Sequence, residues 1–191
     1  MKHSSKTPDT PALLKKLHKH KINYVLIGSV AAQLYGVDVQ PGDLDITPAL
    51  DRQNLNRLAE FLVDIEARLP DGPGGHWEHQ EGGEKKWISH GDPTPEELAE
   101  RAAWVPDPDD VSSFDSLFYT KYGNFDVVPD LTGDYEALMR RAIQADAFGQ
   151  SIWVAHVDEL LAALTVPRRE KDRPCVLDLR EIQRQAILPK V

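Results

Sequence analysis

The stretch Asp43-Leu44-Asp45-Ile46 contains two aspartates whose spacing would allow their carboxylates to bind a metal ion together. Side chains two residues apart in a β-strand project to the same face, so Asp43 and Asp45 should present their carboxylates together. Two ionised carboxylates side by side repel each other, and a divalent cation neutralises such a pair. The spacing therefore predicts a metal-ligating pair. Asp-x-Asp alone is weak evidence in an acidic chain, and we interpret the second match, Asp107-x-Asp109, as solvated loop.

The second candidate is the pair Gly28-Ser29, which follows an apolar run and opens a short helix. A strand that turns directly into a helix aims unpaired backbone N–H groups and the positive end of the helix dipole at one point, which suits a phosphate. Gly28 allows close backbone approach, and Ser29 adds a hydroxyl. The alternative is an ordinary turn in which Ser29 is the N-cap of the helix.

The third candidate is Asp126, in the sequence Tyr122-Gly123-Asn124-Phe125-Asp126-Val127-Val128. The tight turn at Tyr122-Gly123 predicts a hairpin with Asp126 in its second strand, between apolar neighbours. A buried charge needs a partner, and a metal ion would serve. The alternative is a structural carboxylate that accepts hydrogen bonds.

Weaker candidates lie in the Gly- and Pro-rich stretch 70–95. His76 and His79 could form a metal pair, although a flexible loop without cysteines is the favoured interpretation. Trp77 and Trp87 could stack on a base, and packing is the alternative.

The densest positive charge is the run Arg168, Arg169, Lys171 and Arg173. Such runs are usually solvated faces. If this run converges on the carboxylates, it would hold phosphates or an RNA end.

The elements that must position these residues alternate along the chain between helical and extended periodicity. Helices are predicted over Pro11–His20, Val30–Tyr35, Asp51–Leu69, Pro95–Trp104, Gly133–Ala145, Val157–Val166 and Cys175–Ile187, and strands over Ile22–Ile27, Asp43–Thr47, Phe114–Thr120, Asn124–Val128 and Ser151–Ala155. This order indicates a mixed α+β fold. Residues 70–95 are predicted to form a long mobile loop or an irregular hairpin. We expect a core over residues 1–155 and a C-terminal helical appendage over 156–191.

The composition of the chain indicates its size class, the partners it disfavours and the compartment that it fits. The chain has 191 residues, of which 41% are hydrophobic, as expected for a globular protein of about one domain. A net charge of −9 disfavours adhesion of the whole surface to polyanions. Cys175 is the single cysteine, which excludes an intramolecular disulfide and fits a reducing compartment. The sequence shows neither a signal peptide nor a membrane span, so we expect a cytoplasmic protein with no membrane partner.

Taken together, the Gly-Ser turn, the Asp-x-Asp and the later Asp126 resemble the nucleotidyltransferases of the DNA polymerase β superfamily. The matching stretch runs from Tyr24 to Val128, more than half of the chain. The resemblance implies a polymerase-β-like core and transfer of a nucleoside monophosphate from an NTP to an acceptor hydroxyl. It implies catalytic and metal-ligating roles for Asp43, Asp45 and Asp126 around two Mg²⁺ ions, and nucleotide binding by Gly28 and Ser29.

The C-terminal segments Val157–Leu161, Arg169–Asp172 and Leu177–Leu179 look like the last helices of the AbiEii-like and MenT-like nucleotidyltransferase toxins. This narrower resemblance implies that Arg169 and Lys171 also bind the nucleotide, that the 3′ end of a tRNA is the favoured acceptor, and that a cognate antitoxin is a partner. A small-molecule or protein acceptor is the alternative within enzymes. A non-catalytic nucleotide-binding module is the alternative outside them.

Overall fold

The computed structural model describes residues 6–79, 85–164 and 173–189, with only the backbone described for residues 75–77, 79 and 85–87. The helices are α1 (Thr10–Lys19), α2 (Gly28–Tyr35), α3 (Arg52–Asp64), α4 (Pro95–Ala103), α5 (Tyr135–Met139), α6 (Val157–Leu164) and α7 (Arg173–Gln185). The strands are β1 (Tyr24–Ile27), β2 (Leu44–Pro48), β3 (Gly75–His79), β4 (Lys85–Ser89), β5 (Ser116–Thr120), β6 (Gly123–Val127), β7 (Ile143–Ala147) and β8 (Gln150–Val154). This inventory confirms the predicted α+β class.

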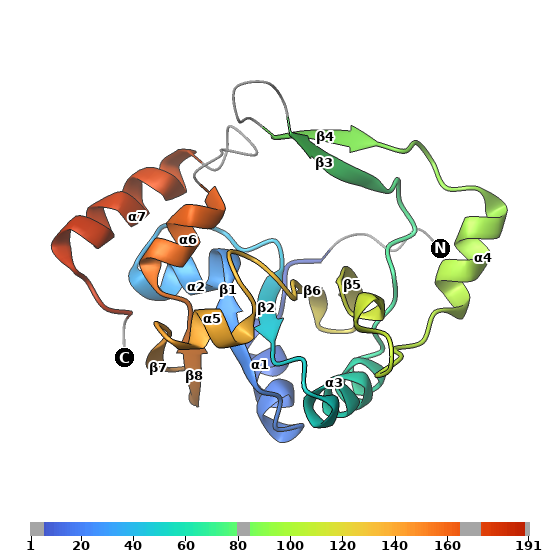
Figure 1. Cartoon of the computed structure of the whole chain (residues 1–191), viewed down its shortest axis with the longest axis horizontal. Coiled ribbons are helices and arrows are strands. Elements are labelled where there is room, and N and C mark those ends of the chain that lie inside the picture. Colours follow the sequence, from blue (N-terminus) through green and yellow to red (C-terminus); the bar gives the residue numbers. More distant parts are fainter. Residues whose placement is uncertain (1–5, 80–84, 165–172, 190–191) are drawn as a thin grey trace.

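Six strands form one mixed sheet in the order β5-β6-β2-β1-β8-β7 (Figure 1). The two central strands, β1 and β2, are antiparallel, while β6 is parallel to β2 and β8 is parallel to β1. Each outer pair, β5–β6 and β7–β8, is an antiparallel hairpin. The strands from the N-terminal quarter of the chain therefore lie in the middle of the sheet, and later strands are added on both sides.

Helices α1 and α3 lie below the main sheet in Figure 1 and bury its apolar face. Phe61 of α3 packs edge-on against Phe125 of β6, with ring centroids 5.2 Å apart. Leu44 and Ile46 of β2 are completely buried on this same side. Because side chains alternate along a strand, the residues between them, Asp45 on β2 and Asp126 on β6, face the opposite side of the sheet.

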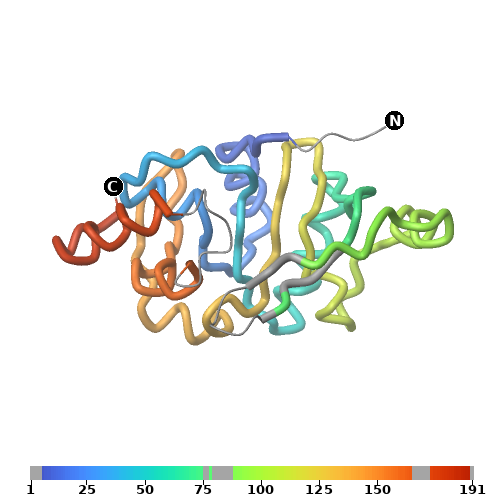
Figure 2. The backbone as a smooth tube through the Cα atoms, turned by 90° about the horizontal axis from the view of Figure 1, so that it is seen from above, coloured from blue at the N-terminus to red at the C-terminus, as the bar shows by residue number. Residues whose placement is uncertain are grey.

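Helix α2 contacts β1 and β2, and α6 and α7 pack against α2. Strands β3 and β4 lie above the main sheet in Figure 1 and cross in front of it in Figure 2, while α4 and α7 lie at opposite ends of the molecule. Of the two alternatives for residues 70–95, the structure thus contains the hairpin, in which β3 and β4 pair antiparallel.

Two helix predictions were wrong in their extent. The helix predicted over Gly133–Ala145 ends at Met139, and Ile143–Ala147 forms strand β7 instead, because pairing with β8 outweighs the helix propensity of these residues. Helix α3 ends at Asp64 rather than Leu69, because Glu66 adopts a positive φ of 56° and the chain leaves to bridge Tyr119 of β5 through Arg68.

Among the helices that the structure describes, none combines the length and the apolar composition that a transmembrane span requires.

Candidate active site

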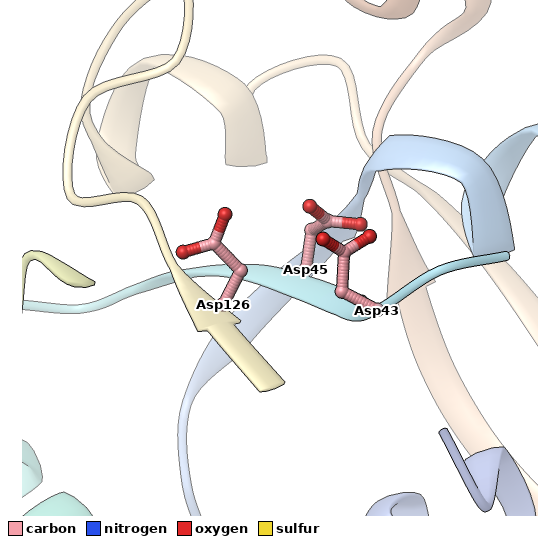
Figure 3. Close-up of side chains that lie close together, drawn as sticks. All are labelled: Asp43, Asp45 and Asp126. Carbon is pink, nitrogen blue, oxygen red and sulfur yellow. The ribbon is translucent and has the colours of Figure 1, made fainter. Parts of the chain in front are cut away.

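The candidate site is built on one transverse row of residues across three strands. The register of β1 and β2 places Ile27 opposite Asp45, and the register of β2 and β6 places Asp45 opposite Asp126. Asp43 immediately precedes β2. Figure 3 shows the three aspartate side chains standing on one side of the sheet and close together. The fold therefore brings together residues more than 80 positions apart in the sequence.

We call Asp43, Asp45 and Asp126 the carboxylate cluster. One carboxylate oxygen of each residue lies within 4.8 Å of the others, and all three residues are partly buried. Carboxylate oxygens are the ligands that Mg²⁺ and other hard divalent cations prefer. The donor set and its spacing fit such a cation.

Burial and neighbouring charge act together on Asp126. Loss of hydration, followed by the negative charges of Asp43 and Asp115, raises the pKa of Asp126 to about 7, and a hydrogen bond from the backbone of Val127 only partly opposes this rise. The raised pKa means that these surroundings, burial first, disfavour the ionised form of Asp126. A divalent cation would supply positive charge that favours it. Asp115, just before β5, is a contributor that the sequence analysis missed.

Gly28 allows the turn between β1 and α2 to approach the carboxylate cluster. Its φ of +66° lies in the left-handed region, which a residue with a side chain adopts only with strain. A Cβ atom at this position would also lie 2.1 Å from Oδ2 of Asp45. Two independent constraints therefore require glycine where the first turn of α2 meets Asp45.

Ser29 does not serve as the N-cap that the alternative interpretation required. The N-cap of α2 is Ile27, and no side chain caps the helix. The hydroxyl oxygen of Ser29 is buried and has no hydrogen-bond partner among the described residues. A buried hydroxyl without a partner costs free energy, so its retention beside a helix N-terminus points to a ligand that it would bind.

Other predicted candidates have different outcomes. Arg168, Arg169 and Lys171 lie outside the described residues, as do the side chains of His76, His79, Trp77 and Trp87. Asp109 forms an exposed ion pair with Arg52, which agrees with its interpretation as solvated loop.

A further residue, Asn124, was missed by the sequence analysis. It lies two positions before Asp126 on β6, and its side chain donates a hydrogen bond to the carbonyl oxygen of Gly42 at 3.0 Å. Its spacing from Asp126 was the available signal, because residues two apart on a strand share a face.

The comparisons with known proteins give a distant likeness. No protein-family model matches the chain, and the search of curated proteins found no match. Among solved structures, the chain is similar to a nucleotidyltransferase-type protein from Thermotoga maritima, at 16% identity and a TM-score of 0.46, over 92% of this chain and 91% of that one. It is similar to the same degree to an antigenic nucleotidyltransferase-like protein from Paracoccidioides brasiliensis, over 90% of this chain and 73% of that one. The function has to be argued from the chain's own residues.

Proposed function

We propose that the protein is a metal-dependent nucleotidyltransferase, which transfers a nucleoside monophosphate from an NTP to an acceptor hydroxyl and releases pyrophosphate. One observation carries this proposal: the carboxylate cluster lies directly against the N-terminus of α2, with Gly28 in contact with Asp45. The carboxylates suit divalent cations, and the helix N-terminus suits phosphate oxygens. A triphosphate with its metal ions needs both at adjoining positions.

In this proposal the carboxylate cluster binds the metal ions, and the turn at Gly28 and Ser29 binds the phosphates. Asp43, Asp45 and Asp126 would hold two Mg²⁺ ions, which when bound neutralise phosphate charge and lower the pKa of the attacking hydroxyl. The backbone N–H groups of Gly28 and Ser29, with the Ser29 hydroxyl, would donate hydrogen bonds to the β- and γ-phosphates. These donors are fixed before the substrate arrives, so stabilising the negative charge on the leaving pyrophosphate requires little reorganisation.

Calorimetry tests the proposal. Each NTP is titrated into wild-type protein with Mg²⁺ and with EDTA, and the same titrations are made with Asp45→Asn and with Asp146→Asn, which alters an exposed carboxylate on the edge strand β7. We expect Mg²⁺-dependent heat for at least one NTP in wild type and Asp146→Asn, and none in Asp45→Asn. The proposal fails if wild type binds no NTP, or if binding is equal in EDTA.

For the acceptor, we propose the 3′ end of a tRNA, which the toxin-like C-terminal segments favour. On a chain of net charge −9, RNA must dock on local positive charge such as the run Arg168–Arg173. The same resemblance adds a cognate antitoxin as a partner. Incubating the protein with labelled NTP and separate RNA, protein and metabolite pools identifies the acceptor. Label in a protein or a small molecule would replace the tRNA proposal and leave the nucleotidyltransferase proposal intact.

A further inference from the structure

Asp43 differs from the other two members of the carboxylate cluster in how it is held. Asp45 and Asp126 lie within strands, and their positions follow from the sheet register. Asp43 precedes the first residue of β2 and follows the turn at Pro41-Gly42. Its place in the cluster therefore depends on what fixes this turn.

Asn124 fixes the turn from the neighbouring strand. The residue is only 5% exposed, and its Nδ2 donates a hydrogen bond to the carbonyl oxygen of Gly42 at 3.0 Å. Asn124 lies at the start of β6, two residues before Asp126 and on the same face of the sheet. One strand thus carries a carboxylate of the cluster and the amide that holds the residue beside a second carboxylate.

Asn124 is held in turn by the N-terminal segment, residues 6–9. The backbone N–H of Lys6 donates to Oδ1 of Asn124 at 3.3 Å, and the backbone N–H of Asn124 donates to the carbonyl oxygen of Lys6 at 3.0 Å. Asp9 donates from its backbone to the carbonyl oxygen of Tyr122 at 2.7 Å. These bonds orient the amide of Asn124 so that its nitrogen faces Gly42.

Glycine at position 123 makes this packing possible. Its φ is +97°, and a Cβ atom there would lie 2.5 Å from the carbonyl oxygen of Thr7 and 2.7 Å from Cα of Pro8. The N-terminal segment therefore lies directly on the backbone of β6, which leaves no room for a side chain.

We propose that Asn124 is a positioning residue for the metal site: it holds the turn that presents Asp43, and the N-terminal segment holds Asn124. This inference rests on the proposed function, because it gives Asp43 a metal to bind. Partners that orient metal ligands from outside the coordination sphere typically change metal affinity about 10- to 100-fold when they are removed. The hydrogen bond from Asn124 to Gly42 acts one residue away from the ligand, so we expect an effect at the low end, about tenfold.

Titration of Mn²⁺ into the metal-free full-length protein, followed by electron paramagnetic resonance of free Mn²⁺, tests this without NTP or turnover. Asn124→Ala should weaken Mn²⁺ binding about tenfold. The matched control is Asn54→Ala. Asn54 is also a buried asparagine whose Nδ2 donates to backbone carbonyl oxygens, those of Asn23 and Ala49, so its loss also lowers the melting temperature, but it belongs to α3, which packs on the face of the sheet opposite the carboxylate cluster. Asn54→Ala should leave the Mn²⁺ affinity within about twofold.

A second pair of variants keeps the test decisive if Asn124→Ala does not fold. Lys6→Pro removes the backbone N–H that donates to Asn124, whereas Lys6→Ala keeps it, and Lys6 is exposed. Lys6→Pro should bind Mn²⁺ more weakly than Lys6→Ala does, while the melting temperatures of the two variants should be equal.

Three results would overturn the inference. Equal Mn²⁺ affinity in wild type and Asn124→Ala removes the positioning role while the proposed function stands. Equal affinity in Lys6→Pro and Lys6→Ala removes the part of the N-terminal segment. If wild type does not bind Mn²⁺ more tightly than Asp43→Ala does, the proposed function is overturned, and this inference with it.

Discussion

Two aspartate centres lie on opposite faces of the same sheet and have opposite electrostatic character. Asp64, at the end of α3, forms hydrogen bonds with His20 at 2.9 Å and with Lys16 at 2.9 Å, and these partners, His20 first, hold its pKa well below the usual range. Asp126, on the other face, is partly buried near Asp43, and loss of hydration together with the charge of Asp43 raises its pKa to about 7. The first arrangement stabilises the folded chain. The second is unfavourable without a cation, which is the pattern of a functional site.

The comparison predicts that removing a carboxylate has opposite consequences on the two faces. Under the proposed function, Asp45→Asn removes a metal ligand and should lower the rate of nucleotidyl transfer by about 100- to 1000-fold. The metal-free variant should be at least as stable as wild type, since one repulsive charge is gone. Turnover assays and thermal unfolding in EDTA measure the two effects. Transfer at more than about a tenth of the wild-type rate would remove Asp45 from the metal site.

Gly28 and Gly149 form a matched pair for the next prediction. Both have a positive φ, +66° and +74°, but the space where a Cβ would lie is occupied by Asp45 at Gly28 and is open at Gly149. Each alanine variant should pay a backbone strain of about 1 kcal/mol. Only Gly28→Ala should also displace Asp45 and abolish Mn²⁺ binding. If both variants bind Mn²⁺ like wild type, the close approach has no role in the site.

Ser29→Ala should have a smaller effect. The backbone N–H groups of the α2 N-terminus remain, so the variant loses one charge-assisted hydrogen bond, worth about 1.5–3 kcal/mol, which corresponds to about 10- to 150-fold weaker use of NTP. The free energy of unfolding should not fall, because the Ser29 hydroxyl has no partner among the described residues to lose. The dissociation constant for Mg²⁺-NTP and urea unfolding check both parts. A stability loss without any change in NTP use would make Ser29 structural.

The smallest effect is expected at Asp64, on the face of the sheet opposite the carboxylate cluster. It concerns only the pH dependence of the stability of the folded chain. A carboxylate with a lowered pKa in the folded state contributes stability above its unfolded pKa, near 3.9, and this contribution is lost as the pH falls. Asp64→Asn should therefore lower the melting temperature by a few degrees at pH 5–6, and the difference should shrink below about pH 4. Asp64 is partly exposed, and screening by solvent and salt keeps this effect small. A constant difference down to pH 2 would mean that packing, not charge, is responsible. Mn²⁺ binding near neutral pH should not change.

The sequence was informative where the chemistry is local. Asp43 and Asp45 are two residues apart, and the apolar run before Gly28 predicts a strand that enters a helix. The hairpin around Tyr122-Gly123 was also predicted, which placed Asp126 on a strand. What the sequence could not provide was the register that sets Asp45 between Ile27 and Asp126, since this depends on pairing between distant strands.

Other features had misleading or absent signals. The helix predicted up to Ala145 includes alanine-rich residues that belong to strand β7. The positive-φ residues Phe148 and Gly149 form a tight turn that pairs this strand with β8. Helix α3 stops at a positive-φ glutamate, Glu66, where glycine would have been the recognisable signal. The spacing of Asn124 from Asp126 indicates a shared face of the strand, but its role depends on a contact across 82 residues to Gly42, which this spacing does not encode.

The position of the label in the NTP tests the central claim most directly. The protein is incubated with Mg²⁺ and the RNA, protein and metabolite pools, once with NTP labelled at the α-phosphate and once with NTP labelled at the γ-phosphate. A nucleotidyltransferase incorporates the α-label, releases the γ-label as pyrophosphate, and loses both activities in Asp45→Asn. We predict this result. Incorporation of the γ-label, or no incorporation from any NTP into any pool, would contradict the assignment.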